Sequence, residues 1–179
     1  MWCSGYANAW VKLAGIKRIV NYYIRFFAGM TIAYYDCFIS ENFCRYEFCS
    51  EGPNGKIKKV ILFTRATLNG SFIYNLAFGD VDKYGFFNDF VNSNNQDAEK
   101  VLATVAQAVI AFTNMYPDAL IFAEGSTPSR TRLYQMGLNK FWNEIDCDFS
   151  IYGLFKNGGF EPFRSGVNYI AFACKRKKK

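Results

Sequence analysis

Residues 120–134 constrain the fold more than any other stretch of the chain. Residues 120–123 form a short apolar run of strand length, and the positions that follow suit a turn and then the start of a helix. A hydroxyl side chain can cap a helix by accepting from an unpaired N–H, and proline suits the first helical position because it has no N–H to leave unpaired. These positions hold Gly125, Ser126, Thr127 and Pro128. The stretch therefore predicts a buried strand, a tight turn and a helix in direct succession.

The start of this predicted helix is a candidate anion site. Unpaired N–H groups and the helix dipole favour negative charge at a helix N-terminus. Arg130 and Arg132 fall in the first turns, and an arginine grips phosphate or carboxylate with a fixed fork of donors. The functional interpretation is a phosphate or other anion site formed by Ser126, Thr127 and the two arginines. The structural interpretation is a capped helix whose arginines are solvated or pair with Glu124, and both interpretations stay open.

Hydrophobic patterns on either side of this stretch extend the fold. A hairpin signal at 50–55 separates two of the predicted strands, and Gly137 is expected to end the second helix. We expect one or two strands within 32–49, where 46–49 alternate, further strands at 56–64, 72–78, 148–154 and 168–174, and a helix at 98–115 capped by Asp97. The order β-β-β-α-β-α-β-β predicts an α+β fold with a mostly antiparallel sheet and helices on the sheet faces.

A chain of 179 residues has the length of one domain. We expect residues 30–179 to form a single α+β domain and residues 1–29 to form an N-terminal extension. Apolar residues in the extension have helical spacing, which leaves three interpretations open: a peripheral helix over a sheet edge, a segment upstream of a start at Met30, or a helix on a membrane surface. No apolar run reaches the roughly 18 residues of a membrane span, so we expect a soluble protein.

The net charge of +6 is concentrated at the two ends of the chain. Residues 1–29 hold four basic residues and no acidic one, and residues 175–179 are all basic. The body between them is therefore slightly acidic, and a basic groove for nucleic acid is not indicated. We expect the partner to be a small anionic ligand or an acyl-CoA, and we expect no nucleic acid.

The residue types exclude several kinds of chemistry. The chain has no histidine, so Ser-His and Cys-His nucleophiles are absent, and its six cysteines include no C-x-x-C pair, so we expect no metal site. Asp80 and Asp82 share one face of a strand and Asp89 follows, an arrangement that can hold a divalent cation but that more often forms a turn. Reduced thiols are typical of the cytoplasm, where we expect this protein.

The predicted order of elements resembles the core of the GNAT-type N-acetyltransferases, which has three antiparallel strands, a helix, a strand, a helix and two last strands. The second helix of that family commonly carries Asn-x-x-Ala-x-x-x-Tyr, followed by Gly-Phe. Here Thr127 stands at the Asn position, Arg130 at the Ala position and Tyr134 at the Tyr position. Gly137 comes one residue early, and Leu138 replaces the Phe.

This resemblance implies roles for particular residues. Tyr134 would be the general acid that protonates the leaving thiolate of coenzyme A, and acetyl-CoA would be the cofactor. Arg130, Arg132, Ser126 and Thr127 would lie near the cofactor phosphates. Before the first helix, the family has a Gln/Arg-x-x-Gly-x-Gly/Ala loop that cradles the pyrophosphate. This chain has no glycine at that place, where Asn94 and Asn95 would contact the cofactor and Asp97 adds a carboxylate.

A closer resemblance is to an uncharacterised family of small bacterial proteins that contain a domain of unknown function. It covers about residues 43–177 and implies no activity. The segments that carry it are 46–48, 75–80, 100–105 and 125–134.

Two functions follow as expectations. The first is a diverged, GNAT-like, acyl-CoA-dependent N-acyltransferase. The second is a non-catalytic binding module that uses the helix start at 125–132 to hold an anionic ligand or an acidic protein partner.

Overall fold

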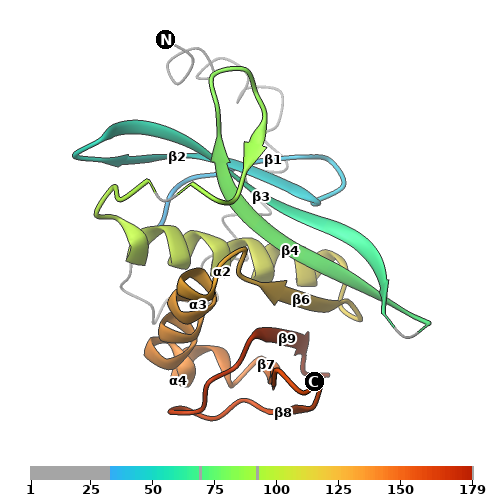
Figure 1. The fold of residues 1–179 in the computed structure, drawn as a ribbon. Helices are drawn as coiled ribbons and strands as arrows, with labels where there is room; N and C mark the ends of the chain where they lie inside the picture. Colours follow the sequence, from blue (N-terminus) through green and yellow to red (C-terminus); the bar gives the residue numbers. More distant parts are fainter. Residues whose placement is uncertain (1–32, 69, 92, 179) are drawn as a thin grey trace. The chain divides into compact units, whose positions relative to one another are not determined.

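One nine-stranded sheet runs through the described part of the chain (Figure 1). The computed structural model describes residues 33–68, 70–91 and 93–178. The predicted extension at 1–29 lies outside the described residues. The strands are β1 (Phe38–Ile39), β2 (Arg45–Gly52), β3 (Gly55–Leu68), β4 (Ser71–Val81), β5 (Phe87–Asn88), β6 (Leu120–Glu124), β7 (Phe149–Leu154), β8 (Phe160–Pro162) and β9 (Ala171–Arg176).

The strands lie in the order β1-β2-β3-β4-β6-β9-β7-β8, and β5 pairs with β4. Every pairing among them is antiparallel except that of β4 with β6, which is parallel. The described chain is therefore a mixed α+β structure with a mostly antiparallel sheet, as predicted. The short strand β1 lies within 32–49, where one or two strands were expected, but β5 and β8 were not foreseen, because segments of two or three residues carry no periodic signal.

The predicted hairpin at 50–55 is confirmed. Gly52 pairs with Gly55, and the register of β2 and β3 continues from there to Arg45 and Leu62. Alternate residues of β2 are buried, including Tyr46 and Phe48, because successive side chains of a strand point to opposite faces. This alternation of residue types in β2 determines which side of the hairpin packs on the core.

Three helices complete the described part: α2 (Ala98–Met115), α3 (Pro128–Lys140) and α4 (Trp142–Ile145). The bounds of α2 match the prediction. Alternate residues of β4, β6, β7 and β9 share one cavity with residues of all three helices, so these helices lie on one face of the sheet. The sequence predicted helices on the sheet faces, and in the described part of the chain the helices lie on one of them. The connections from β4 to β6 and from β6 to β7 move the same way across the sheet, and right-handed crossovers in one direction place their helices on the same side.

Gly137 lies inside α3, contrary to the prediction that it ends the helix. A Cβ atom at this position would lie 3.2 Å from Cδ1 of Leu102 on α2. The glycine therefore allows two helices to approach closely, and the helix continues to Lys140. Tertiary packing outweighs the helix-ending tendency of glycine at this point.

Aromatic side chains fill the space between α2 and the sheet. Phe63 stacks on Phe112 with ring centroids 4.1 Å apart, and Tyr74 meets Phe112 edge to face at 4.9 Å. Fully burying a side chain of this size stabilises the fold by about 1.5–3 kcal/mol. None of the helices in the described part is both long and apolar enough to cross a membrane.

Candidate functional site

The parallel contact between β4 and β6 is short. Only Tyr74, Asn75 and Leu76 of β4 pair with β6, opposite Ile121, Phe122 and Ala123. Beyond these pairs β4 continues to Val81, whereas β6 ends at Glu124 and α3 begins at Pro128. In this second half of β4, the backbone oxygen of Phe78 accepts from Arg130 of α3, and Asp80 and Val81 pair with the short strand β5. The candidate site lies at this junction.

The first turn of α3 is capped as the sequence predicts. Thr127 is the N-cap residue, and its Oγ1 accepts from the backbone N–H of Arg130 at 3.3 Å. Pro128 stands in the first turn, where its missing N–H leaves nothing unpaired. The hydroxyl of Thr131 accepts from the backbone N–H of Gly125 at 3.2 Å, which ties the turn to the helix.

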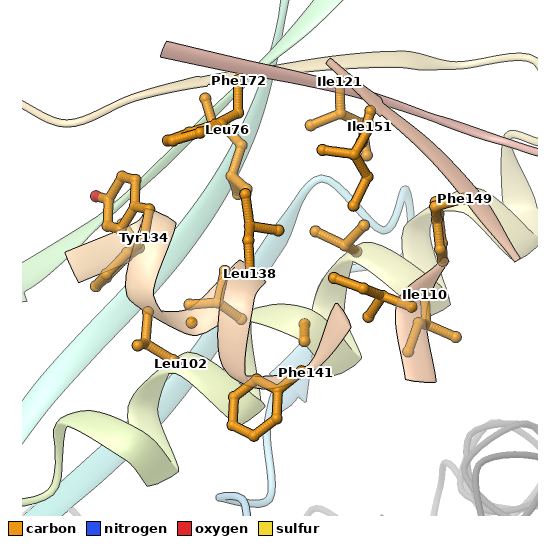
Figure 2. Close-up of a pocket in the computed structure, with 18 residues that line it drawn as sticks. Leu76, Leu102, Ile110, Ile121, Tyr134, Leu138, Phe141, Phe149, Ile151 and Phe172 are labelled. Atoms are coloured by element: carbon orange, nitrogen blue, oxygen red, sulfur yellow. The ribbon is translucent and has the colours of Figure 1, made fainter. Parts of the chain in front are cut away.

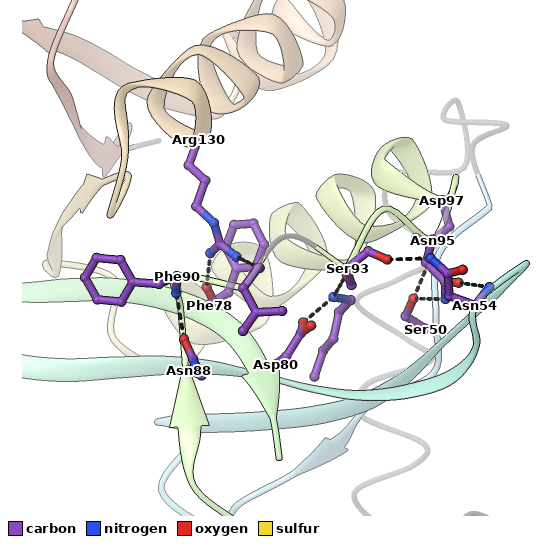
Figure 3. A network of polar contacts seen from close by, with 12 residues as sticks. Ser50, Asn54, Phe78, Asp80, Asn88, Phe90, Ser93, Asn95, Asp97 and Arg130 are labelled. Atoms are coloured by element: carbon purple, nitrogen blue, oxygen red, sulfur yellow. Dashed lines mark hydrogen bonds and ion pairs between the residues drawn. The ribbon is translucent and has the colours of Figure 1, made fainter. Parts of the chain in front are cut away.

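A segment of the chain's own backbone lies against this helix start, and we call residues 86–91 the strap (Figure 3). The hydroxyl of Ser126 donates to the backbone oxygen of Asp89 at 2.5 Å. The guanidinium of Arg130 donates to the backbone oxygen of Phe78 at 3.1 Å and to that of Val91 at 2.6 Å. Two predicted anion-binding residues thus hold backbone oxygen atoms of the protein itself.

The strap also lies very close to β4. A Cβ atom at Gly79 would be 2.5 Å from the backbone oxygen of Asn88, so only a glycine permits this approach. Arg132, the other predicted arginine, is exposed on α3. The structure therefore brings Ser126, Thr127 and Arg130 together at the helix start and leaves Arg132 facing solvent.

The predicted cofactor loop before α2 is held by a different set of bonds. Asn95 is 3% exposed, its Oδ1 accepts from the N–H of Asn54 at 3.0 Å, and its Nδ2 donates to Oγ of Ser50 at 2.9 Å and to the oxygen of Gly55 at 3.1 Å. The backbone oxygen of Asn94 accepts from Nδ2 of Asn54 at 3.4 Å. These contacts fasten the loop to the tip of the β2–β3 hairpin, and we call them the latch.

Asp97 belongs to the latch as well. It occupies the N-cap position of α2 but makes no side-chain cap, contrary to the prediction. Its Oδ2 instead accepts from the hydroxyl of Tyr35 at 2.8 Å and from that of Ser50 at 2.6 Å. These partners are distant in sequence, so the local pattern that predicts a cap contains no sign of them.

The carboxylates weighed as metal ligands are engaged elsewhere. Asp80 forms a buried ion pair with Lys59, whose Nζ also donates to Oγ of Ser93 at 2.8 Å. Asp82 accepts from the backbone N–H groups of Tyr84 and Phe86, each at 2.9 Å, and so forms a turn. Within the described ranges, no group of three or more His, Cys, Asp or Glu side chains is placed to hold a metal ion.

An apolar cavity of about 150 Å³ lies beside the helix start, between the sheet and the helices (Figure 2). It is lined from β4, β6, β7, β9, α2, α3 and α4. The lining residues are Leu76, Phe78, Leu102, Val105, Ala106, Val109, Ile110, Ile121, Ala123, Tyr134, Gly137, Leu138, Phe141, Ile145, Phe149, Ile151, Phe172 and Cys174.

Tyr134 connects the cavity with the helix start. Its ring lines the cavity and lies 5.2 Å from the ring of Phe78. Its hydroxyl points away from the other labelled lining side chains (Figure 2). Burial raises the pKa of this hydroxyl, the charge and hydrogen bond of Arg130 oppose the rise, and the charge of Asp89 adds to it. The phenol therefore keeps its proton at neutral pH and can serve as a proton donor.

Two features of the site were missed by sequence reasoning. The cavity is one, because its lining comes from seven elements that are remote in sequence. Asp89 is the other: it was considered only as a possible metal ligand, whereas its charge acts on Tyr134. In the sequence, Asp89 stands just before the polar run 92–97, which marks it as part of a polar connection. That position does not reveal that the strap lies against α3, where Asp89 comes near Tyr134.

Comparison with known proteins assigns the chain to a family through a sequence model. The sequence model of one family, described as "Family of unknown function (DUF6934)", matches residues 31–177. No curated protein and no solved structure matches the chain.

Proposed function

The chain belongs to DUF6934, a family of unknown function, and from this premise we propose that it is a diverged, GNAT-like, acyl-CoA-dependent N-acyltransferase. The arrangement of the strands supports the proposal. Three antiparallel strands are followed by a helix, a strand, a helix and two closing strands once the short strands β1, β5 and β8 and the single turn of α4 are set aside. The parallel contact between β4 and β6 opens toward the start of α3, where the resemblance expects the acyl donor.

The position of Tyr134 is the observation that carries the proposal. Its ring borders an apolar space, and its hydroxyl lies where the charges of Arg130 and Asp89 act on it. In the proposed reaction an amine attacks the carbonyl carbon of the thioester, so that a C–N bond forms and the C–S bond breaks. Tyr134 gives its proton to the leaving thiolate, and the carboxylate of Asp89 takes the proton that the amine loses.

The hydrogen-bond donors at the start of α3 are of the kind that bind a pyrophosphate. The hydroxyl of Ser126 and the guanidinium of Arg130 already hold oxygen atoms, those of the strap and of Phe78. In the proposal they exchange strap oxygens for phosphate oxygens of the acyl-CoA substrate. In the proposal the exposed Arg132 also contacts these phosphates, whereas the side chain of Asn95 stays bound in the latch.

The test is the Tyr134→Phe variant, assayed by release of thiol from acetyl-CoA in the presence of primary amines such as spermidine and lysine peptides. We expect kcat to fall by about 10²–10⁴-fold with little change in KM, because only proton donation is removed. Tyr152→Phe, at a partly exposed position on β7, is the matched control and should keep full activity. If the wild-type protein releases no thiol and acetyl-CoA does not raise its Tm, the proposal is wrong.

A second candidate is a non-catalytic module that holds an anionic ligand or acidic partner at residues 125–132. The observation that favours it is the pair of donors, Ser126 and Arg130, that holds strap oxygens at the helix start. For this module we expect phosphate or ATP to raise the Tm, Arg130→Met to abolish the rise, and Tyr134→Phe to leave it intact.

We also propose a cytoplasmic location. Cys37, Cys44, Cys147 and Cys174 are free thiols, which is typical of proteins from a reducing compartment.

A further inference from the structure

We infer that the cavity is the binding site for the hydrocarbon part of the acyl group, and that it selects a medium chain of about six carbon atoms. This inference rests on the proposed function and adds the substrate class. The donor would be a medium-chain acyl thioester in place of the acetyl thioester that the family resemblance implies.

The chemistry of the lining restricts the ligand to hydrocarbon. Apart from the hydroxyl of Tyr134, the only heteroatom that the lining side chains carry is the sulfur of Cys174. Burial raises the pKa of this thiol to about 12, so it is neutral at pH 7. A polar or charged substituent would find no partner in this space and would lose its hydration. A straight or branched alkyl chain loses nothing by entering it.

The size of the cavity sets the capacity. Its volume is about 150 Å³. An apolar cavity of about that volume stays dry and takes up benzene, a molecule of six carbon atoms. An acetyl group would leave most of the space empty, and a chain much longer than six carbons would require the surrounding helices to move.

Small residues keep the space open on facing elements. Ala106 on α2, Ala123 on β6 and Gly137 on α3 all line the cavity. A larger side chain at Ala106 or Ala123 would project into the volume that they border. The cavity thus depends on residue choices at three separate elements.

The position of Tyr134 gives the bound chain a direction. In Figure 2 Tyr134 lies on one side of the cavity, and Ile110 and Phe149 lie on the other. The thioester carbonyl would stand near the Tyr134 hydroxyl, and the methyl end of the chain would reach Ile110 and Phe149. The residues at the far side would then determine the longest chain that fits.

The experiment compares acetyl-, butanoyl-, hexanoyl- and decanoyl-CoA as donors for the full-length protein, using thiol release and thermal unfolding. Each buried methylene should improve kcat/KM by about fourfold up to hexanoyl, and decanoyl should be poorer. Benzene, which has no thioester, should raise the Tm of the wild-type protein by occupying the same space. It reports on the cavity independently of catalysis.

Two variants change the cavity in opposite directions. Ala106→Leu should narrow it, abolish the effect of benzene and move the preference toward acetyl-CoA. Ile110→Ala should lengthen it at the far side and move the preference toward decanoyl-CoA. The second variant keeps the inference testable if the first does not fold.

The outcomes separate the two proposals. Thiol release that is equal for acetyl- and hexanoyl-CoA, with no effect of benzene, overturns the chain-length inference and leaves the acyltransferase standing. Binding of benzene and hexanoyl-CoA that Ala106→Leu abolishes, without any thiol release, overturns the acyltransferase and leaves a hydrocarbon site. Absence of both effects overturns both.

Discussion

The strap at the start of α3 and the latch at the start of α2 contrast with the apolar cavity, because their polar groups have partners within the protein and the cavity stays unfilled. In the strap and latch, the side chains of Ser126, Arg130 and Asn95 all bind partners within the chain. In the cavity, side chains from seven elements leave about 150 Å³ unfilled. Polar residues that look like a ligand site in sequence therefore hold the fold together, and the space for a ligand lies among apolar residues.

The difference follows from the energetics of burial. A buried polar group that lacks a partner is costly, so a folded chain supplies partners of its own wherever it can. An apolar wall next to an empty space loses only contacts, and the loss is smaller. A binding site for hydrocarbon can therefore persist in the folded state, whereas an anion site at α3 requires the strap to be displaced.

The largest effect is expected at the buried ion pair beside the strap. Asp80→Ala should lower the free energy of unfolding by about 3–5 kcal/mol, because the charge of Lys59 would remain buried without its partner. The two side chains are 11% and 7% exposed. Urea denaturation measures the change. Glu99→Ala, which breaks the exposed pair with Lys140, should cost at most about 1 kcal/mol. Equal losses of stability in the two variants would contradict the view that burial makes the Lys59–Asp80 pair more important to the fold than the exposed Lys140–Glu99 pair.

A smaller effect is expected where the strap meets α3. Arg130→Met removes the bonds to Phe78 and Val91, which should cost about 1.5–3 kcal/mol because the donor is charged. Chymotrypsin should then cut faster at the exposed Phe86 and Phe90 of the strap. Arg132→Met on the same helix is the matched control, with an expected change within about 0.5 kcal/mol. Unchanged cleavage in Arg130→Met would show that the strap does not depend on this arginine.

The smallest effect concerns a polar atom in the aromatic core between α2 and the sheet. Among the described residues, the hydroxyl of Tyr46 is buried without a hydrogen-bond partner. Tyr46→Phe should therefore stabilise the protein at pH 7 by up to about 1 kcal/mol, as measured by urea denaturation. A loss of stability would mean that this hydroxyl has a partner after all.

The same variant has a predicted pH dependence. Burial raises the pKa of Tyr46 above its ordinary value of 10.0, so the folded state holds the proton more tightly than the unfolded state. The stability associated with this proton is complete below about pH 10 and is lost as the pH rises further. Stability should therefore fall less steeply above pH 10 in Tyr46→Phe than in the wild-type protein.

The sequence predicted those parts of the fold that depend on local signals. The hairpin at 50–55, the bounds of α2 and the cap at Thr127 each rest on residues within a few positions of one another. The end of α3 was predicted wrongly because Gly137 packs against Leu102, a contact between helices. Helix propensity depends on the local sequence and does not include a contact with another helix.

The site was predictable only in part for the same reason. The sequence placed Ser126, Thr127, Arg130 and Tyr134 on one turn and helix. It did not reveal that Asp89 and Val91 approach from about forty residues away along the chain to meet Ser126 and Arg130. The cavity needs side chains from seven elements, so its existence depends on the finished fold.

The short parallel contact between β4 and β6 has a consequence for the order of folding. Strands β2, β3 and β4 are neighbours in sequence and pair through hairpins, so their contacts close short loops and can form early. The contact between Leu76 and Ala123 closes a loop that includes all of α2. The other edge of β6 pairs with β9, which comes about fifty residues later in the chain. We expect residues 45–81 to gain protection from hydrogen exchange before residues 120–176, with the three-residue contact between β4 and β6 as the late step that joins the two halves.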